Sequence, residues 1–117
     1  AAVVALGNHY VAMFTKDEAL SSDLLSSAAA AGEDVWPMPL PDHYKSQLKA
    51  EWGEIKNVGG RAGGSITAAL FLSEFVDGPK WAHLDIAGPA FLDKGFRHFA
   101  AGGTGSMVPT LARWVAS

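Results

Sequence analysis

The chain has 117 residues and a formal net charge of −3; 49% of its residues are hydrophobic, 10% aromatic and 18% charged. This length suffices for one small domain, and the apolar fraction is that of a globular protein. Because no basic stripe or Lys/Arg cluster is present, we expect no binding to nucleic acid. The longest apolar run, residues 66–72, is too short to cross a membrane. The absence of cysteine excludes disulfides and thiolate metal sites, and fits a cytoplasmic location.

Two features indicate that the chain packs against other protein. The charged fraction of 18% lies below the quarter or so that is typical, and a small domain on its own needs polar residues to cover its surface. The chain also opens directly on an apolar run, Ala1 to Leu6, which ends at Gly7 like the middle of an element. We therefore expect an incomplete domain, with a removed initiator methionine or a choice of expressed sequence as the alternative explanation.

The first third of the sequence predicts a short helix or turn, a strand and a long helix. Residues 1–6 form the helix or turn, and the apolar run 10–14 predicts the strand. Thr15 and Glu18 have the spacing of a capping box, in which Thr15 accepts a backbone N–H and Glu18 reaches back. Apolar residues then recur at helical spacing up to Gly32, which can supply a left-handed cap: Leu20, Leu24, Ala28 and Ala31.

The middle third predicts an extended segment, a short helix, a loop and an apolar helix. In residues 35–41 three prolines alternate with other residues, and each forces its predecessor out of the helical region. A buried connection is favoured there over a polyproline ligand. A short helix begins at Pro41, and residues 57–64 form a glycine-dense loop. Residues 65–76 are apolar on nearly every side, which is typical of a helix buried on more than one face.

The last third predicts a strand and a final helix. Residues 81–87 alternate in polarity, as a strand does. Glycine-rich residues 102–105 lead into a helix that carries Pro109 in its first turn. Helices that alternate with strands predict an α/β fold. The apolar stripe of the final helix consists of Val108, Leu111, Ala112 and Val115.

The glycine-dense loop 57–64 could hold an anion, because glycines let backbone N–H groups approach a ligand. However, no Lys-Ser pair of a P-loop follows, and the glycine order is not the dinucleotide fingerprint. A packing loop before a buried helix is therefore favoured, in which Arg61 holds a carboxylate or a carbonyl.

Few residues are suited to catalysis. His83 and Asp85 share one strand face and could be half of a metal site or an acid/base pair, but a catalytic zinc usually takes three protein ligands. A hydrogen-bonded pair that orients the strand end is favoured. No serine lies in a nucleophile-elbow pattern. Apart from the adjacent pair Asp42-His43, whose members do not share a helix face, the sequence places no acidic residue at metal-ligand spacing from the three further histidines: His9, His43 and His98.

Several segments together resemble the leucine aminopeptidases, or cytosol aminopeptidases. They follow the family's order along the whole chain, and residues 1–7 look like the stretch after the family's Thr-Leu-Thr-Gly segment. The most specific is Trp81–Ala90 (WAHLDIAGPA). The resemblance implies that residues 1–117 are the C-terminal portion of a mostly parallel α/β/α sandwich catalytic domain. The other matching segments are Val35–Leu40 (VWPMPL), Lys56–Arg61 (KNVGGR), Thr67–Val76 (TAALFLSEFV) and Gly103–Gly105 (GTG).

The resemblance also implies the chemistry, a hydrolysis assisted by two divalent metal ions, manganese or zinc. In the family these ions are held by a lysine, three aspartates and a glutamate, and an arginine and a further lysine take part in catalysis. By the family's order all of these residues lie upstream of Ala1. We therefore expect no catalytic residue and no metal ligand in this chain, and no activity from it alone.

The resemblance implies that this chain contributes residues that line the substrate pocket. Ala87 and Ala90 match residues that line the pocket for the N-terminal side chain of the substrate, and Val58 matches an apolar residue on the leaving-group side. Small apolar residues suit such a pocket, because a leucine side chain gains about 1.5–3 kcal/mol on burial. Some family members carry a bulkier residue at the position of Ala90, so the preferred side chain stays open.

The partners implied are the remainder of the subunit, other subunits of a homohexamer and a peptide substrate, in the cytoplasm, without nucleic acid or membrane. The alternative is a non-catalytic binding or oligomerisation module that holds a ligand at residues 59–64. A third reading, a phosphate-binding enzyme, requires an anion at residues 59–64 or 102–105.

Overall fold

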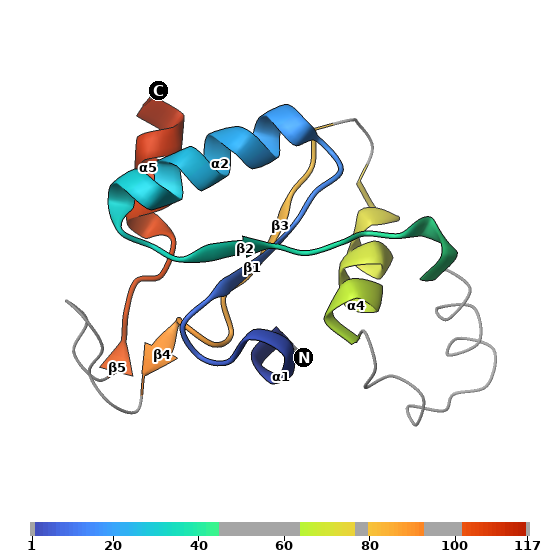
Figure 1. Cartoon of the computed structure of the whole chain (residues 1–117), viewed down its shortest axis with the longest axis horizontal. Helices are drawn as coiled ribbons and strands as arrows, with labels where there is room; N and C mark the ends of the chain where they lie inside the picture. Colours follow the sequence, from blue (N-terminus) through green and yellow to red (C-terminus); the bar gives the residue numbers. More distant parts are fainter. Residues whose placement is uncertain (1, 45–63, 77–79, 93–101, 117) are drawn as a thin grey trace.

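The computed structural model describes residues 2–44, 64–76, 80–92 and 102–116. Within these ranges a three-stranded sheet, a two-stranded ladder and several helices alternate along the chain (Figure 1). The elements are α1 (Ala2–Leu6), β1 (Val11–Phe14), α2 (Glu18–Ala31), β2 (Val35–Pro37), η1 (Asp42–Tyr44), α4 (Gly64–Ser73), β3 (His83–Asp85), β4 (Phe91–Leu92), β5 (Gly102–Gly103) and α5 (Val108–Ala116).

The three-stranded sheet has the order β2-β1-β3. β1 pairs parallel with β2, where Val11 lies opposite Val35, and antiparallel with β3, where Ala12 lies opposite Asp85. The parallel pair is joined through α2, as a parallel connection requires a crossover. β4 and β5 form a separate antiparallel ladder. The α/β prediction is confirmed, and the described sheet contains one parallel and one antiparallel pairing.

The core is built on β1. All four of its residues are buried, and because successive side chains of a strand point to opposite faces, protein covers both faces of β1. On one face the side chains pack with α1 and with α4. The buried residues of that cluster are Ala2, Ala12, Phe14, Ile66, Ala69 and Leu70.

Helix α2 begins two residues later than the capping box predicts. Its N-cap is Asp17, whose Oδ1 accepts from the Leu20 amide at 2.9 Å. The Thr15 hydroxyl instead accepts from the Asp17 amide at 3.1 Å and donates to the Trp81 carbonyl at 2.5 Å. The assignment of Thr15 as N-cap is wrong because this side chain ties the end of β1 to the segment before β3. The predicted cap at Gly32 is confirmed, with φ 75°.

Replacing Asp17 with alanine is expected to destabilise the first turn of α2 by about 1 kcal/mol, because one amide then loses its acceptor. Faster amide hydrogen exchange over residues 18–21 measures this, and Asp17→Asn, which keeps the acceptor, serves as the control. If Thr15→Ala opened this turn more than Asp17→Ala does, Asp17 would not be the cap.

Helix α4 confirms the predicted buried helix, although it ends at Ser73 and leaves one side open. The residues buried in its N-terminal half include the polar Ser65 and Thr67. Leu72, by contrast, is 42% exposed. The short helix predicted after Pro41 is the 3-10 turn η1.

Helix α5 packs against α2 (Figure 1), and its predicted apolar stripe is largely exposed. Thr110 is fully buried, and Met107 just before the helix is 3% exposed. In contrast, Val108 is 66% and Val115 75% exposed. The predicted apolar stripe of Val108, Leu111, Ala112 and Val115 therefore lies mostly exposed on this helix. We call these four residues the α5 stripe.

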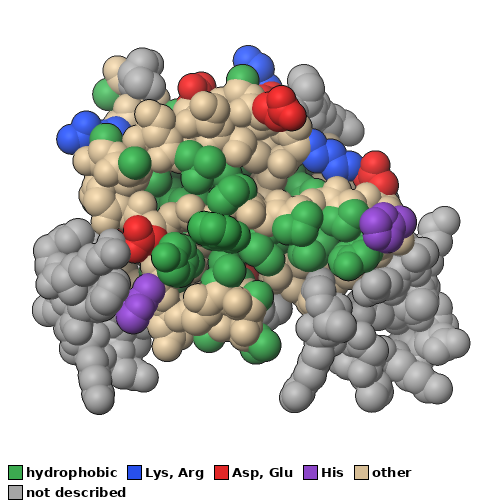
Figure 2. Space-filling view, viewed as in Figure 1, with side chains coloured by type: hydrophobic (Ala, Val, Ile, Leu, Met, Phe, Trp, Pro, Cys, Tyr) green, Lys and Arg blue, Asp and Glu red, His purple; other side chains and the backbone are tan. Residues whose placement is uncertain are grey.

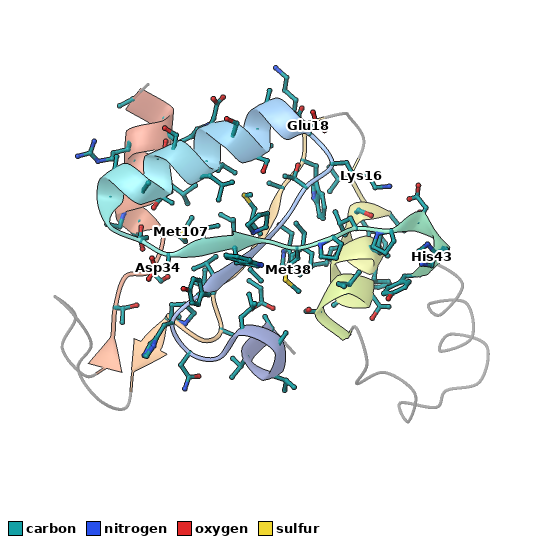
Figure 3. All side chains as sticks on the ribbon, viewed as in Figure 1. Lys16, Glu18, Asp34, Met38, His43 and Met107 are labelled. Atoms are coloured by element: carbon teal, nitrogen blue, oxygen red, sulfur yellow. The ribbon has the colours of Figure 1, made fainter. Side chains whose placement is uncertain are left out.

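A second apolar surface runs along β2. Figure 2 shows hydrophobic side chains in a band across the middle of one face, between Asp34 and His43, with Met38 near the centre (Figure 3). Trp36 is 55% and Tyr10 41% exposed, and their rings meet edge-on with centroids 6.2 Å apart. In the part of the chain that the structure describes, no helix is both long and apolar enough to span a membrane.

Candidate functional site

The structure gives His83 and Asp85 on β3 separate partners. The His83 ring stacks on Trp81, with centroids 6.4 Å apart, and lies 5.7 Å from the ring of Phe14. The Asp85 carboxylate accepts from the Ala87 amide at 3.1 Å. His83 thus packs among aromatic rings, and Asp85 begins a turn. The prediction of a hydrogen bond between His83 and Asp85 is therefore wrong.

A tight turn follows β3, and it carries two of the three residues predicted to line the pocket. We call Ile86 to Ala90 the 86–90 turn. The Ala90 amide donates to the Ile86 carbonyl at 2.9 Å, which closes the turn, and Asp85 accepts from Ala87 at its start. Ala87 is exposed and Ala90 is half-buried.

The middle of the 86–90 turn lies directly on the connection between α1 and β1. Gly88 is buried, and a Cβ at this position would lie 2.6 Å from the Gly7 carbonyl oxygen and 3.1 Å from the Cα of Asn8. Such approaches are below normal contact distances, so only glycine fits without movement. Gly7 itself has φ 77° and ends α1, with its amide bonded to the Val3 carbonyl at 2.8 Å.

The end of the 86–90 turn is held by Thr104. Its amide donates to the Ala90 carbonyl at 3.0 Å, and its hydroxyl donates to the Pro89 carbonyl at 2.6 Å. The turn is therefore fixed at its start by Asp85, in its middle by Gly88 and at its end by Thr104. In the sequence, Gly88 and Thr104 stand out only as members of the matching segments, and nothing there reveals these contacts.

The remaining site predictions fall outside the described residues. Val58, Arg61, His98 and the loop 57–63 all lie there, so the structure does not place them. Among residues 2–44, 64–76, 80–92 and 102–116, no group of three or more His, Asp or Glu side chains is arranged to hold a metal ion.

The segment 102–105 leads to a helix N-terminus that is already occupied by a carboxylate of this chain. Glu33 is buried, and its Oε2 accepts from the Met107 amide at 2.6 Å. Its Oε1 accepts from the Thr110 amide at 3.1 Å and from the Thr110 hydroxyl at 2.6 Å. Because Glu33 uses these donors, the N-terminus of α5 does not offer them to an external anion. The sequence carries no signal for this contact.

Comparison with known proteins agrees with the resemblance in the sequence. Residues 1–112 match the sequence profile of the cytosol aminopeptidase family, catalytic domain. A probable cytosol aminopeptidase of Solibacter usitatus is 50% identical over 113 residues, which cover 97% of this chain and 24% of that protein. Another, of Prochlorococcus marinus subsp. pastoris, is 49% identical over 116 residues, which cover 98% of this chain and 24% of that protein.

Solved structures show the same fold for this region. The bottromycin maturation enzyme BotP in complex with Mn superposes with a TM-score of 0.84 at 39% identity, over 98% of this chain and 26% of that one. A mutant of tomato leucine aminopeptidase gives a TM-score of 0.82 at 36% identity, over 97% of this chain and 22% of that one. The chain spans about a quarter of the length of the relatives it matches. It belongs to the cytosol aminopeptidase family, a family of metal-dependent peptidases.

Proposed function

We propose that residues 1–117, a single and incomplete domain, form substrate-side wall and scaffold in an aminopeptidase that removes leucine-like residues from peptide N-termini. The observation that carries this proposal is the 86–90 turn. It lies in the segment most specific to the family, presents two small apolar side chains and is fixed at three points. A rigid turn of this kind suits a pocket, because a wall that does not move selects ligands by shape.

Ala87 and Ala90 line the pocket for the N-terminal side chain in this proposal, and Val58 contributes on the leaving-group side. A wall of alanines offers apolar contact without filling the pocket. Burial of a leucine side chain there gains about 1.5–3 kcal/mol, which favours apolar N-terminal residues.

The described residues do not fit a metal site, since they lack a suitable group of ligands. In the proposed enzyme two divalent ions, manganese or zinc, supply the hydrolytic chemistry, and other parts of the subunit hold them. The structure of BotP with Mn supports a metal of this type in the family.

The proposed partners are the remainder of the subunit and further copies in a homohexamer, in the cytoplasm. The α5 stripe and the band along β2 support this, because each leaves large apolar side chains uncovered in this chain, among them Val115 at 75% and Trp36 at 55% exposure. Exposed apolar side chains that lie together are typical of contact sites.

An assay with leucine p-nitroanilide and Mn²⁺ or Zn²⁺ tests the function. We expect the complete protein to release nitroaniline, to lose this activity with a chelator and to recover it with metal. The isolated chain is expected to release none. Metal-dependent hydrolysis by the isolated chain would contradict the pocket-wall role. An inactive complete protein, together with a monodisperse and folded isolated chain, would favour the binding module instead.

A substitution in the complete protein tests the pocket assignment in the same assay. Ala90→Leu narrows the proposed pocket and should hinder a large N-terminal side chain more than a small one. The ratio of kcat/KM for leucine p-nitroanilide to kcat/KM for alanine p-nitroanilide is therefore expected to fall about 10-fold or more. Ala30→Leu, on the exposed side of α2, is the control and should leave this ratio unchanged.

A further inference from the structure

Thr104 contacts the 86–90 turn at the residue that the proposed function places in the pocket. In the β4–β5 ladder Phe91 lies opposite Gly103, and one step further Thr104 donates its amide to the carbonyl of Ala90. The ladder thus continues into the turn and fixes the backbone of Ala90.

The hydroxyl of Thr104 adds a bond that no backbone group supplies. It donates to the Pro89 carbonyl at 2.6 Å, one residue beyond the amide contact. Two adjacent peptide groups of the turn are therefore bound by a single residue, which lies 15 positions after Pro89. Because the carbonyls of both peptide planes that flank the Ala90 Cα are held, neither plane rotates freely, and the direction of the Ala90 side chain is fixed with them.

The other contacts of the turn do not duplicate this one. Asp85 and Ile86 bond to amides within the turn, and Gly88 fixes the distance of its middle from Gly7. The Ile86 carbonyl holds the N–H end of the Pro89–Ala90 peptide, and the Thr104 hydroxyl supplies the second point by holding its carbonyl end.

From this geometry we infer that Thr104 is a positioning residue, which sets how far Ala90 stands into the pocket and so determines selectivity among N-terminal side chains. The inference rests on the proposed function, in which Ala90 lines that pocket. Thr104 does not contact the substrate in this scheme; it acts through the two carbonyls that it binds.

The test compares Thr104→Val, which keeps the branched shape but removes the hydroxyl, with Thr104→Ser, which keeps the hydroxyl. Both are made in the complete protein, and kcat and KM are measured with the p-nitroanilides of leucine and alanine. Loss of one hydrogen bond is expected to lower the selectivity for leucine over alanine by about 2- to 10-fold in Thr104→Val. The change should be mainly in KM, and Thr104→Ser should stay within about 2-fold of the unchanged protein.

Amide hydrogen exchange over residues 86–92 supplies a readout that does not depend on activity. We expect faster exchange there in Thr104→Val and not in Thr104→Ser. Faster exchange with an unchanged leucine-to-alanine ratio, or an equal loss for both substrates, would overturn the positioning role while the proposed function stands. Unchanged exchange in Thr104→Val would overturn it as well. If the complete protein without any substitution had no peptidase activity, the proposed function itself would be overturned, and the positioning role with it.

Discussion

Replacing Glu33 with glutamine is expected to loosen α5 from α2 by about 2 kcal/mol. The carboxylate accepts three hydrogen bonds in a buried place, two from amides at the start of α5 and one from the Thr110 hydroxyl. An amide has only one accepting oxygen, so one of its N–H groups must face a backbone N–H. Hydrogen bonds to charged groups contribute about 1.5–3 kcal/mol each, and a buried donor left unpaired costs about 1–3 kcal/mol.

The backbone at Met107 adds to this expected loss. Met107 has φ 71°, a left-handed conformation that is costly for a residue with a side chain. Its amide is bonded to Glu33 Oε2 at 2.6 Å, and its side chain is 3% exposed, so the surrounding contacts hold this conformation. When the Met107 amide loses its acceptor on Glu33, the backbone of Met107 can leave the left-handed conformation, and the first turn of α5 is expected to unfold more easily.

Amide hydrogen exchange of residues 108–116 measures the loosening. Glu18→Gln is the matched control, because Glu18 is exposed in the first turn of α2 and its substitution should change stability by less than about 0.5 kcal/mol. Equal protection of α5 in Glu33→Gln and Glu18→Gln would show that the carboxylate does not hold the helix.

The elements that the sequence predicts well are those with local causes. Gly32 adopts the left-handed conformation that ends α2, and Pro37 and its neighbours keep β2 extended, because these residues limit their own backbone. The cap of α2 could not be predicted in this way. The Thr15 hydroxyl is bound to the Trp81 carbonyl, 66 residues away, so a choice between Thr15 and Asp17 depends on the tertiary fold.

Which face of α5 is buried also depends on a contact between residues far apart in the sequence. The pattern of apolar residues favours burial of Val108 and Leu111, yet the buried residue is Thr110. Its amide and hydroxyl both donate hydrogen bonds to the carboxylate of Glu33, which lies 77 positions earlier in the chain. A polar side chain is buried at little cost when its hydrogen bonds are satisfied. Periodicity alone cannot reveal such a partner.

In the candidate site, strand β3 is shorter than the predicted 81–87. β3 pairs only with β1 in the described sheet, and β1 ends at Phe14, opposite His83. Ala87 and Ala90 come from the resemblance to a family, and their assignment to a pocket stays a prediction. Two restraints on their turn, by contrast, are visible only in three dimensions, because the approach of Gly88 to Gly7 and the bond from Thr104 to Pro89 join segments far apart in the sequence.

Replacing Gly88 with alanine is expected to have the largest effect on the 86–90 turn. The new Cβ would lie 2.6 Å from the carbonyl oxygen of Gly7 and 3.1 Å from the Cα of Asn8. Both neighbours are backbone atoms, so no side chain can rotate away, and either the turn or the connection between α1 and β1 must move. We expect a local destabilisation of about 1–3 kcal/mol, which is typical of overpacking.

The cost at Gly88 is steric, because its φ lies outside the left-handed range that favours glycine. Gly103→Ala on the adjoining ladder is therefore a matched control: a Cβ there meets nothing within 4 Å, and its φ is also outside that range. Amide hydrogen exchange over residues 7–10 and 86–90 should rise in Gly88→Ala and stay unchanged in Gly103→Ala.

In the complete protein, displacement of the turn should also lower kcat/KM for leucine p-nitroanilide by about 10-fold or more, since small misplacements of a substrate are costly. If Gly88→Ala left exchange and activity unchanged, the close approach to Gly7 would not be what fixes the turn. If exchange rose without any loss of activity, the turn would be held as described but would not line the pocket. These two outcomes separate the packing of the turn from the role proposed for it.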